Sequence, residues 1–500
     1  MKSALATTFV HASIYTVGIV LNRAISFIML PLYTHVLSPK DYGILELLEM
    51  TVDVVTIVTG MGVLHGLFKF YHDYQEREEK NELVSTLFTM VIALYFVASL
   101  AGGFFAHRLA STVLGSGEYA DLVRLSFVNL FLQFLIYPSM AYLRVRQKST
   151  LFVAVNAIKL FIQVFLNILF IVYLKMGVAG VLYGTMLSSL AIGGWLLCYT
   201  FAEVRFRFST EKAKRLLRFG LPFVVSSLGA FILTFSDRYF LNYYRELSVV
   251  GVYALAYKFG FLLITFPVGP LMNIWMVQRF ELISKEGYER IFNQFLSWFC
   301  IVTVAVMLGI AVSVGDLLQF MSAPAFWPAA GVVPVILMAY FLQACTDFFN
   351  FGIYYTGKTE HIAYGTIVAV LAIVALSFLL IPKYGMYGAA WATLLSFGVR
   401  LIYVYWASQR LYRVDYALAR PAWTTALGVA IYLIYQSVVR SFPPETSRLL
   451  SLSLGATLFF AFLLLLFHLN LIDSRVRRLI LESMRSPLKT FGELRALYHT

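Results

Sequence analysis

The chain has 500 residues, of which 60% are hydrophobic and 13% charged, and its formal net charge is +13. Its mean hydropathy of +0.78 is far above that of a soluble globular domain, so the composition excludes a soluble enzyme and predicts a multi-pass membrane protein. Basic loops beside anionic lipid head groups explain the positive charge, which therefore gives no reason to expect a nucleic-acid partner.

Apolar runs of about 20 residues, long enough as helices to cross a hydrocarbon core, recur along the whole chain. They predict an all-α fold of about fourteen transmembrane helices. The first run is too long and too charged for a cleaved signal peptide, so it is interpreted as the first span. The predicted spans begin near His11, Gly43, Leu83, Leu122, Ser149, Val178, Phe219, Val249, Phe292, Val332, Ile362, Met386, Pro421 and Leu450.

The distribution of basic residues predicts the orientation of the chain. Most of the 39 lysines and arginines fall in the connections that share a side with both termini, and Arg279 is assigned there. The opposite connections, to which Arg238 is assigned, hold far fewer. By the positive-inside rule both termini are predicted to be cytoplasmic. The basic residues left inside predicted spans are Arg23, Lys159, Lys258 and Arg400.

An internal repeat divides the sequence. KMGVAGVLYGTMLS, from Lys175, matches KYGMYGAAWATLLS, from Lys383, at an offset of 208 residues, and the same offset pairs Gly43 with Gly251. A repeat of six spans predicts two lobes related by a pseudo-two-fold axis along the membrane normal. The predicted parts are an N-terminal six-helix lobe (1–202), a basic cytoplasmic linker (203–218), a C-terminal six-helix lobe (219–412), two additional transmembrane helices (413–472) and a basic cytoplasmic tail (473–500).

Arg23 raises the question of why a predicted span keeps a guanidinium, because an arginine there costs about 2.5 to 3.5 kcal/mol on insertion scales. Counted outward from the first connection, Arg23 lies level with Asp53. Glu46, Glu49 and Asp53 follow spacings of three and four, so they share one helix face. Two interpretations remain open: an ion pair that holds helices in register, or separate sites for anions and cations.

Charged residues of the second half admit the same two interpretations. Asp237 and Lys258 lie at comparable depths of neighbouring predicted spans. Gln343, Asp347 and Asn350 form another polar face, for which hydrogen bonds between helices compete with substrate contact. Lys159 has no evident local partner and could be solvated by reaching the interface, and Arg400 could equally reach toward the cytoplasmic surface.

The segment LNRAISFIMLPLYTHVLSPKDYGILEL (21–47) resembles the first two spans of polysaccharide and oligosaccharide-lipid flippases, the Wzx-like branch of the multidrug/oligosaccharidyl-lipid/polysaccharide exporter superfamily. The matching features are Pro31, Leu37 before a short polar turn, and Tyr42 and Gly43 at the start of the next span. The repeated KxGxxG segments and the fourteen-span plan are similar to that family as well.

The resemblance implies a transporter that flips a polyprenyl-diphosphate-linked oligosaccharide from the cytoplasmic to the outer leaflet of the inner membrane by alternating access, for cell-surface polysaccharide biosynthesis. It implies no cofactor, and contacts with membrane lipids and with glycan polymerases or glycosyltransferases. The two additional helices would shelter the lipid tail. The expected diphosphate-binding residues are Arg23, Lys159, Lys258 and Arg400. The expected ion-coupling or cavity-lining residues are Glu46, Glu49, Asp53, Asp237 and Asp347.

Two other functions are weighed against this one. A cation-coupled exporter of drugs or small amphiphiles is compatible with the same fold, and an excess of acidic cavity residues would favour it. A glycan polymerase or ligase is disfavoured because no long outer loop is evident. The sequence contains no glycine-rich phosphate loop, HExxH or GxSxG motif, so it is not predicted to be an enzyme.

Overall fold

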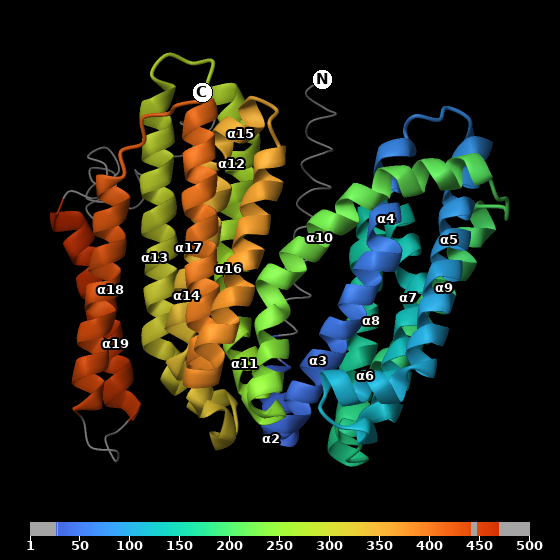
Figure 1. Ribbon diagram of the computed structural model, residues 1–500, viewed down its shortest axis with the longest axis horizontal. Helices are drawn as coiled ribbons and strands as arrows, with labels where there is room; N and C mark the ends of the chain where they lie inside the picture. Colours follow the sequence, from blue (N-terminus) through green and yellow to red (C-terminus); the bar gives the residue numbers. More distant parts are fainter. Residues whose placement is uncertain (1–26, 28, 442–447, 470–500) are drawn as a thin grey trace, which may run out of the picture. The chain divides into compact units, whose positions relative to one another are not determined.

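The structure, a computed structural model, describes residue 27 and residues 29–441 and 448–469 (Figure 1). Within these residues every regular element is a helix, which confirms the predicted all-α fold. The helices of the first half are α2 (Leu30–Val36), α3 (Pro39–Thr56), η1 (Ile57–Met61), α4 (Gly62–Phe70), α5 (Arg77–Phe104), α6 (Ala106–Val113), η2 (Gly117–Tyr119), α7 (Ala120–Val145), α8 (Ser149–Asn167), η3 (Ile168–Tyr173), α9 (Gly177–Glu203) and α10 (Thr210–Tyr244).

The second half continues in the same manner. Its elements are α11 (Leu247–Leu263), η4 (Ile264–Val268), α12 (Gly269–Leu282), α13 (Tyr288–Met321), η5 (Pro324–Gly331), α14 (Val333–Phe349), α15 (Phe351–Tyr355), α16 (Glu360–Tyr384), α17 (Met386–Leu411), α18 (Ala419–Arg440) and α19 (Arg448–His468). Arg238 and Arg279, which the sequence analysis assigned to connections, lie inside α10 and α12. Both side chains are fully buried, which the assignment to connections did not anticipate. The side of the membrane on which each residue lies stays a prediction.

Twelve helices of the described residues are long and apolar enough to cross a membrane. A bent pair, Pro39–Gly60 and Gly62–Phe70, meets at 45° and brings the number to thirteen if it counts as one span. The predicted first span begins near His11, outside the described residues, so the total of fourteen stays a prediction.

Two of the spans carry a π-helical segment at matching places in the repeat. The segment η1 lies between α3 and α4, and η4 lies between α11 and α12. Their first residues, Ile57 and Ile264, are 207 positions apart, one position from the offset found in the sequence. Because π-helical turns are rare and often lie at functional sites, the coincidence marks the second span of each repeat as a place to look for function.

The chain forms two compact units. The first unit comprises Met1–Leu255, Met321–Ala329 and Thr366–Ser396. The second unit comprises Ala256–Phe320, Ala330–Gly365 and Phe397–Thr500. These bounds are set by packing within each unit, and the predicted division into repeat lobes, linker, additional helices and tail stays a prediction.

In the first unit, α7 packs against α5, α8 and α9. Leu135, Leu143, Phe152 and Leu196 belong to a buried apolar cluster shared by α7, α8 and α9. The helix α3 begins sharply because Ser38 accepts a hydrogen bond from the backbone N–H of Asp41, whose carboxylate accepts one from the backbone N–H of Ser38. This capping box fixes the start of the helix that carries Glu46 and Asp53.

In the second unit, aromatic rings pack around the end of α14. The Trp275 ring of α12 stacks on Phe348 with 4.4 Å between ring centroids. A Cβ atom on Gly352 would lie 2.4 Å from the carbonyl oxygen of Ser408, so only glycine permits the close crossing of α15 and α17. The last two helices, α18 and α19, lie side by side (Figure 1).

Candidate functional site

The predicted cationic residues lie on separate helices. Lys159 lies on α8 in the first unit, and Lys258 and Arg400 lie on α11 and α17 in the second unit. All three are half-buried. Arg23 lies outside the described residues, so its predicted partnership with Asp53 stays a prediction.

A buried cluster of charges lies in the first unit around Asp237 and Arg238. Both side chains are fully buried on α10, and Arg238 Nη1 lies 3.2 Å from Asp237 Oδ1. Glu46 of α3 is also buried, and its Oε1 lies 3.6 Å from Arg238 Nε. Tyr253 Oη and Thr393 Oγ1 donate hydrogen bonds to Asp237 Oδ2 over 2.7 and 3.1 Å. The cluster thus joins α3, α10, α11 and the first half of α17.

Arg238 is the member of this cluster that the sequence analysis missed. Its guanidinium lies 5.1 Å from the centroid of the Phe235 ring and 5.7 Å from that of Tyr253, and it donates to the carbonyl oxygen of Thr234. The signal was present, because Arg238 follows Asp237 directly within a long apolar helix. The predicted pairing of Asp237 with Lys258 stays a prediction.

Glu46, Glu49 and Asp53, the acidic residues on one face of α3, differ in burial. Glu46 is buried beside Arg238, whereas Glu49 and Asp53 are exposed. Asp53 interacts electrostatically with Tyr137 of α7 and Tyr239 of α10. Asp53 therefore lies close to side chains of α7 and α10 in the first unit, and its role in a cavity stays a prediction.

Lys159 belongs to a polar face of α8 that the sequence analysis did not identify. Asn156 and Gln163 lie three residues before and four residues after Lys159, which places all three side chains on one face. Gln163 donates to Thr185 Oγ1 of α9 over 3.1 Å. Within the described residues, Lys159 makes no hydrogen bond or ion pair. The spacing of these three residues was the available signal.

In the second unit, two arginines of neighbouring helices, Arg279 of α12 and Arg400 of α17, donate hydrogen bonds to the polar face of α14. Arg400 Nη1 donates to Gln343 Oε1 over 2.8 Å, and Gln343 Nε2 donates to Asp347 Oδ2 over 3.3 Å. Arg279 Nη1 donates to Asn350 Oδ1 over 2.7 Å. We call Arg279, Gln343, Asp347, Asn350 and Arg400 the α14 polar cluster.

An apolar groove of about 770 Å³ lies in the second unit, between α13, α14, α17 and α18. Leu296, Phe341, Leu401 and Leu433 are among the residues that line it, and Thr425 is the one residue of the lining with a polar side chain apart from cysteines. We call it the α18 groove. A lining of this kind binds hydrocarbon rather than a hydrated solute.

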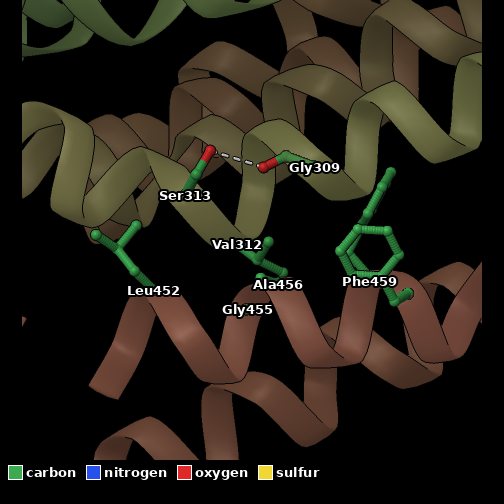
Figure 2. Close-up of a pocket in the computed structure, with 8 residues that line it drawn as sticks. Gly309, Val312, Ser313, Leu452, Gly455, Ala456 and Phe459 are labelled. Carbon is green, nitrogen blue, oxygen red and sulfur yellow. Dashed lines mark hydrogen bonds between the residues drawn. The ribbon is translucent and has the colours of Figure 1, made fainter. Parts of the chain in front are cut away.

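A second apolar pocket, of about 230 Å³, lies between α13 and α19 (Figure 2). Val312 of α13 lies against Gly455 of α19, and Ser313 Oγ donates to the carbonyl oxygen of Gly309 within α13. Small residues allow helices to approach closely in a membrane. Within the described residues, no group of three or more His, Cys, Asp or Glu side chains is placed to hold a metal ion.

The sequence profile of the family described as "Polysaccharide biosynthesis protein" matches residues 11–274, more than half of the chain. The chain belongs to this family. A curated relative is the "Succinoglycan biosynthesis transport protein ExoT" of Rhizobium meliloti (strain 1021), which is 26% identical over 240 residues. That alignment covers 47% of this chain and 46% of the relative, so the chain spans about half the length of the curated relative it matches.

Solved structures resemble the fold of this family member. The "Lipid II flippase MurJ, inward closed conformation" superposes with a TM-score of 0.72 at 12% identity, over 91% of this chain and 98% of that one. An inward-facing multidrug resistance MATE family transporter gives a TM-score of 0.62 at 15% identity, over 79% and 95% of the two chains. The predicted resemblance to the Wzx-like branch of the exporter superfamily is confirmed, and the structural likeness concerns the fold alone.

Proposed function

We propose that this protein moves a polyprenyl-diphosphate-linked oligosaccharide from the cytoplasmic to the outer leaflet of the inner membrane by alternating access, as a step in cell-surface polysaccharide biosynthesis. Membership of the polysaccharide biosynthesis family supports the pathway. The name of the relative from Rhizobium meliloti supports the transport of a polysaccharide or its precursor. Glycan polymerases or glycosyltransferases are proposed as partners that supply or consume the substrate.

The observation that carries the proposal is the α18 groove. Its volume of about 770 Å³ and its almost entirely apolar lining suit a long hydrocarbon chain. A hydrophilic solute would leave such a groove unused. A polyprenyl tail can stay there in surroundings as apolar as the lipid chains that it leaves, while its head group crosses the membrane, which favours a lipid-linked over a free saccharide.

The charged residues supply the other half of the proposal. We propose Arg23, Lys159, Lys258 and Arg400 as residues that attract the diphosphate, because a diphosphate cannot enter hydrocarbon without compensating charge. Glu46, Glu49, Asp53, Asp237 and Asp347 are proposed to line the path or to couple transport to a cation. Transport that is unaffected by clamped proton and sodium gradients would contradict the coupling.

The experiment is a reconstitution in proteoliposomes. A polyprenyl-diphosphate oligosaccharide is placed in one leaflet, and its accessibility to an impermeant enzyme or lectin on the far side is followed in time. Wild type should move the lipid, Arg23→Ala should abolish movement and Arg23→Lys should restore part of it. Absence of movement by correctly inserted wild type under every imposed gradient would contradict the proposal.

The alternative function is a cation-coupled exporter of small amphiphiles. The likeness to a MATE transporter fold and the exposed carboxylates of Glu49 and Asp53 favour it. The same vesicles distinguish the two functions when they are loaded with a fluorescent cationic amphiphile. Gradient-driven movement of the amphiphile, without movement of the lipid-linked oligosaccharide, would replace the proposed function with this one.

A further inference from the structure

Arg279 is a fully buried cation with an incomplete set of hydrogen bonds. Its Nη1 donates to Asn350, but its Nε and Nη2 have no hydrogen-bond partner among the described residues. The guanidinium lies 5.0 Å from the ring centroid of Phe280 and 5.2 Å from that of Tyr354. Aromatic faces orient a guanidinium, but they do not accept the N–H bonds at its edge.

Arg400 shows the same deficit on the opposite side of the α14 polar cluster. One hydrogen bond joins it to Gln343, and its Nε has no partner among the described residues. Both guanidinium groups interact electrostatically with Asp347 and Tyr354, so they converge on the same region of the second unit. Two cations therefore share one carboxylate, and among the described residues that carboxylate forms an ion pair with neither.

A further buried polar group lies close to Arg279. Tyr416 interacts electrostatically with Arg279, and its hydroxyl is buried without a partner among the described residues. An unsatisfied buried polar group destabilises the fold, and more so when it is charged. Two guanidinium groups face a single carboxylate, so the cluster has surplus donors and a net positive charge that one more anionic acceptor would satisfy.

We propose that the α14 polar cluster is an oxyanion site that takes a phosphate-class anion, with Arg279 and Arg400 as its charged ligands and Asn350 holding Arg279 in place. A guanidinium edge offers two parallel N–H bonds that match two oxygens of one phosphate, and a phosphate or pyrophosphate also carries more negative charge than a halide. Tyr354, whose ring lies against the Arg279 guanidinium, is 38% exposed, so the cluster has a neighbour that reaches the surface. The inference deepens the proposed function, which already assigns Arg400 to the diphosphate, and it rests on that function for the natural ligand. A soluble anion tests the site without any transport, so the site and the transport can fail separately.

The charge of Asp347 predicts the direction in which anion affinity changes in a second test. Its carboxylate interacts with both arginines, so a bound phosphate would place another negative charge beside it. Removal of that charge by Asp347→Asn should tighten anion binding several-fold. A cluster that merely holds helices together through the Asp347 charge predicts no anion affinity at all in this variant.

The test uses the full chain purified in neutral detergent and titrated with inorganic pyrophosphate and inorganic phosphate at constant ionic strength, followed by calorimetry and thermal unfolding. Wild type should bind pyrophosphate saturably and unfold at a higher temperature when it is bound. Arg279→Gln and Arg400→Gln should each lose at least about tenfold in affinity, which corresponds to about 1.4 kcal/mol. Arg290→Gln, at an exposed position of α13, is the matched control and should bind as wild type does.

Arg279→Lys replaces Arg279→Gln in the test if the glutamine variant fails to fold. Arg279→Lys retains the charge but lacks the planar edge, and it should lose part of the affinity. Equal stabilisation of wild type by chloride and pyrophosphate, or unchanged pyrophosphate affinity in Arg279→Lys and Arg400→Gln, would overturn the site.

The natural source of the anion is identified in nanodiscs. Competition with pyrophosphate by anionic phosphatidylglycerol, and not by phosphatidylcholine, would assign the site to a lipid head group. Competition by a polyprenyl diphosphate in phosphatidylcholine discs would assign it to the transported lipid. Saturable binding of pyrophosphate without competition by either lipid would assign it to a free phosphate compound.

Discussion

Gly43 and Gly251 pack directly against each other where α3 and α11 begin. A Cβ atom on Gly43 would lie 2.1 Å from the carbonyl oxygen of Leu247, and one on Gly251 would lie 1.9 Å from that of Pro39. Leu247 follows Pro39 by the same 208 positions that separate the two glycines. Gly43 thus lies against Leu247, and its repeat counterpart Gly251 lies against Pro39, the repeat counterpart of Leu247. Reciprocal contacts of this kind are those of a two-fold axis.

Substitution of either glycine should destabilise the first unit. Gly43→Ala and Gly251→Ala each place a methyl group against backbone that cannot move aside, and such overpacking costs about 1 to 3 kcal/mol. Thermal unfolding in detergent measures the loss. Gly194→Ala is the control, because a Cβ atom there meets nothing within 4 Å, and it should be neutral or slightly stabilising. Equal stability of all three variants would contradict the close crossing.

The helices and the repeat could be predicted from the sequence because both depend on local patterns. Apolar runs determine where spans form, and Gly43 and Gly251 are recognisable as a pair from their neighbours in sequence. What sequence could not indicate is that the two glycines touch, since an offset relates positions without placing them in contact. The polar face of α14 was also visible from spacing, but its partner Arg279 was not.

Burial of single charges explains the sites that the sequence analysis missed. Arg238 and Arg279 occupy helix segments near the ends of spans, where an arginine usually reaches water. Their burial depends on residues distant in sequence, such as Glu46 for Arg238 and Asn350 for Arg279. A positive residue at a span end is therefore ambiguous until the tertiary structure is known.

Loss of Arg238 should be costly because it leaves buried carboxylates without this partner. Arg238→Met should reduce the free energy of unfolding by about 3 to 5 kcal/mol. Glu46→Gln combined with Arg238→Met should cost clearly less than the sum of the two single changes, because the pair shares one interaction. A double-mutant cycle by thermal or denaturant unfolding measures the coupling, and additive effects would show that Glu46 and Arg238 act separately.

The end of α9 is anchored by Glu203, which offers a test by pH. Lys148 Nζ donates to Glu203 Oε1 over 2.8 Å and also to the Tyr199 hydroxyl, and Tyr142 Oη donates to Glu203 Oε2 over 2.7 Å. The hydrogen bond of Lys148 to Glu203, and after it the one to Tyr199, raise the pKa of Lys148 above its ordinary value. A raised pKa means that this stabilisation is complete below the ordinary lysine pKa and is lost as the pH rises through the raised value.

Lys148→Gln should therefore be less stable than wild type by a constant amount between about pH 7 and 9, and the difference should shrink above the ordinary lysine pKa of about 10.5. The loss should be about 1 kcal/mol or less, because the pair is partly exposed. Arg290→Gln, an exposed position in the other unit, controls for general charge effects. A stability difference that grows with pH would contradict the assigned pairing.

The α18 groove predicts that transport depends on the length of the lipid tail. Ala426 and Ala430 line the groove from α18, so Ala426→Trp and Ala430→Trp should fill part of it. Movement of a long polyprenyl substrate should fall severalfold, whereas a short-chain analogue with the same diphosphate and sugars should be moved almost as by wild type. Ile434→Trp, at a position of α18 that is 51% exposed and outside the lining, is the matched control.

Comparison of the two substrates separates a tail site from a general defect. A misfolded or misinserted variant would lose movement of both lipids. The groove predicts a loss that grows with chain length, because a longer tail needs more of the space that the tryptophan side chain fills. Rates measured in the same proteoliposomes at several chain lengths give that dependence directly. Equal loss for short and long chains would show that the groove is a packing feature of α13, α14, α17 and α18, and the tail would then have to bind elsewhere on the chain.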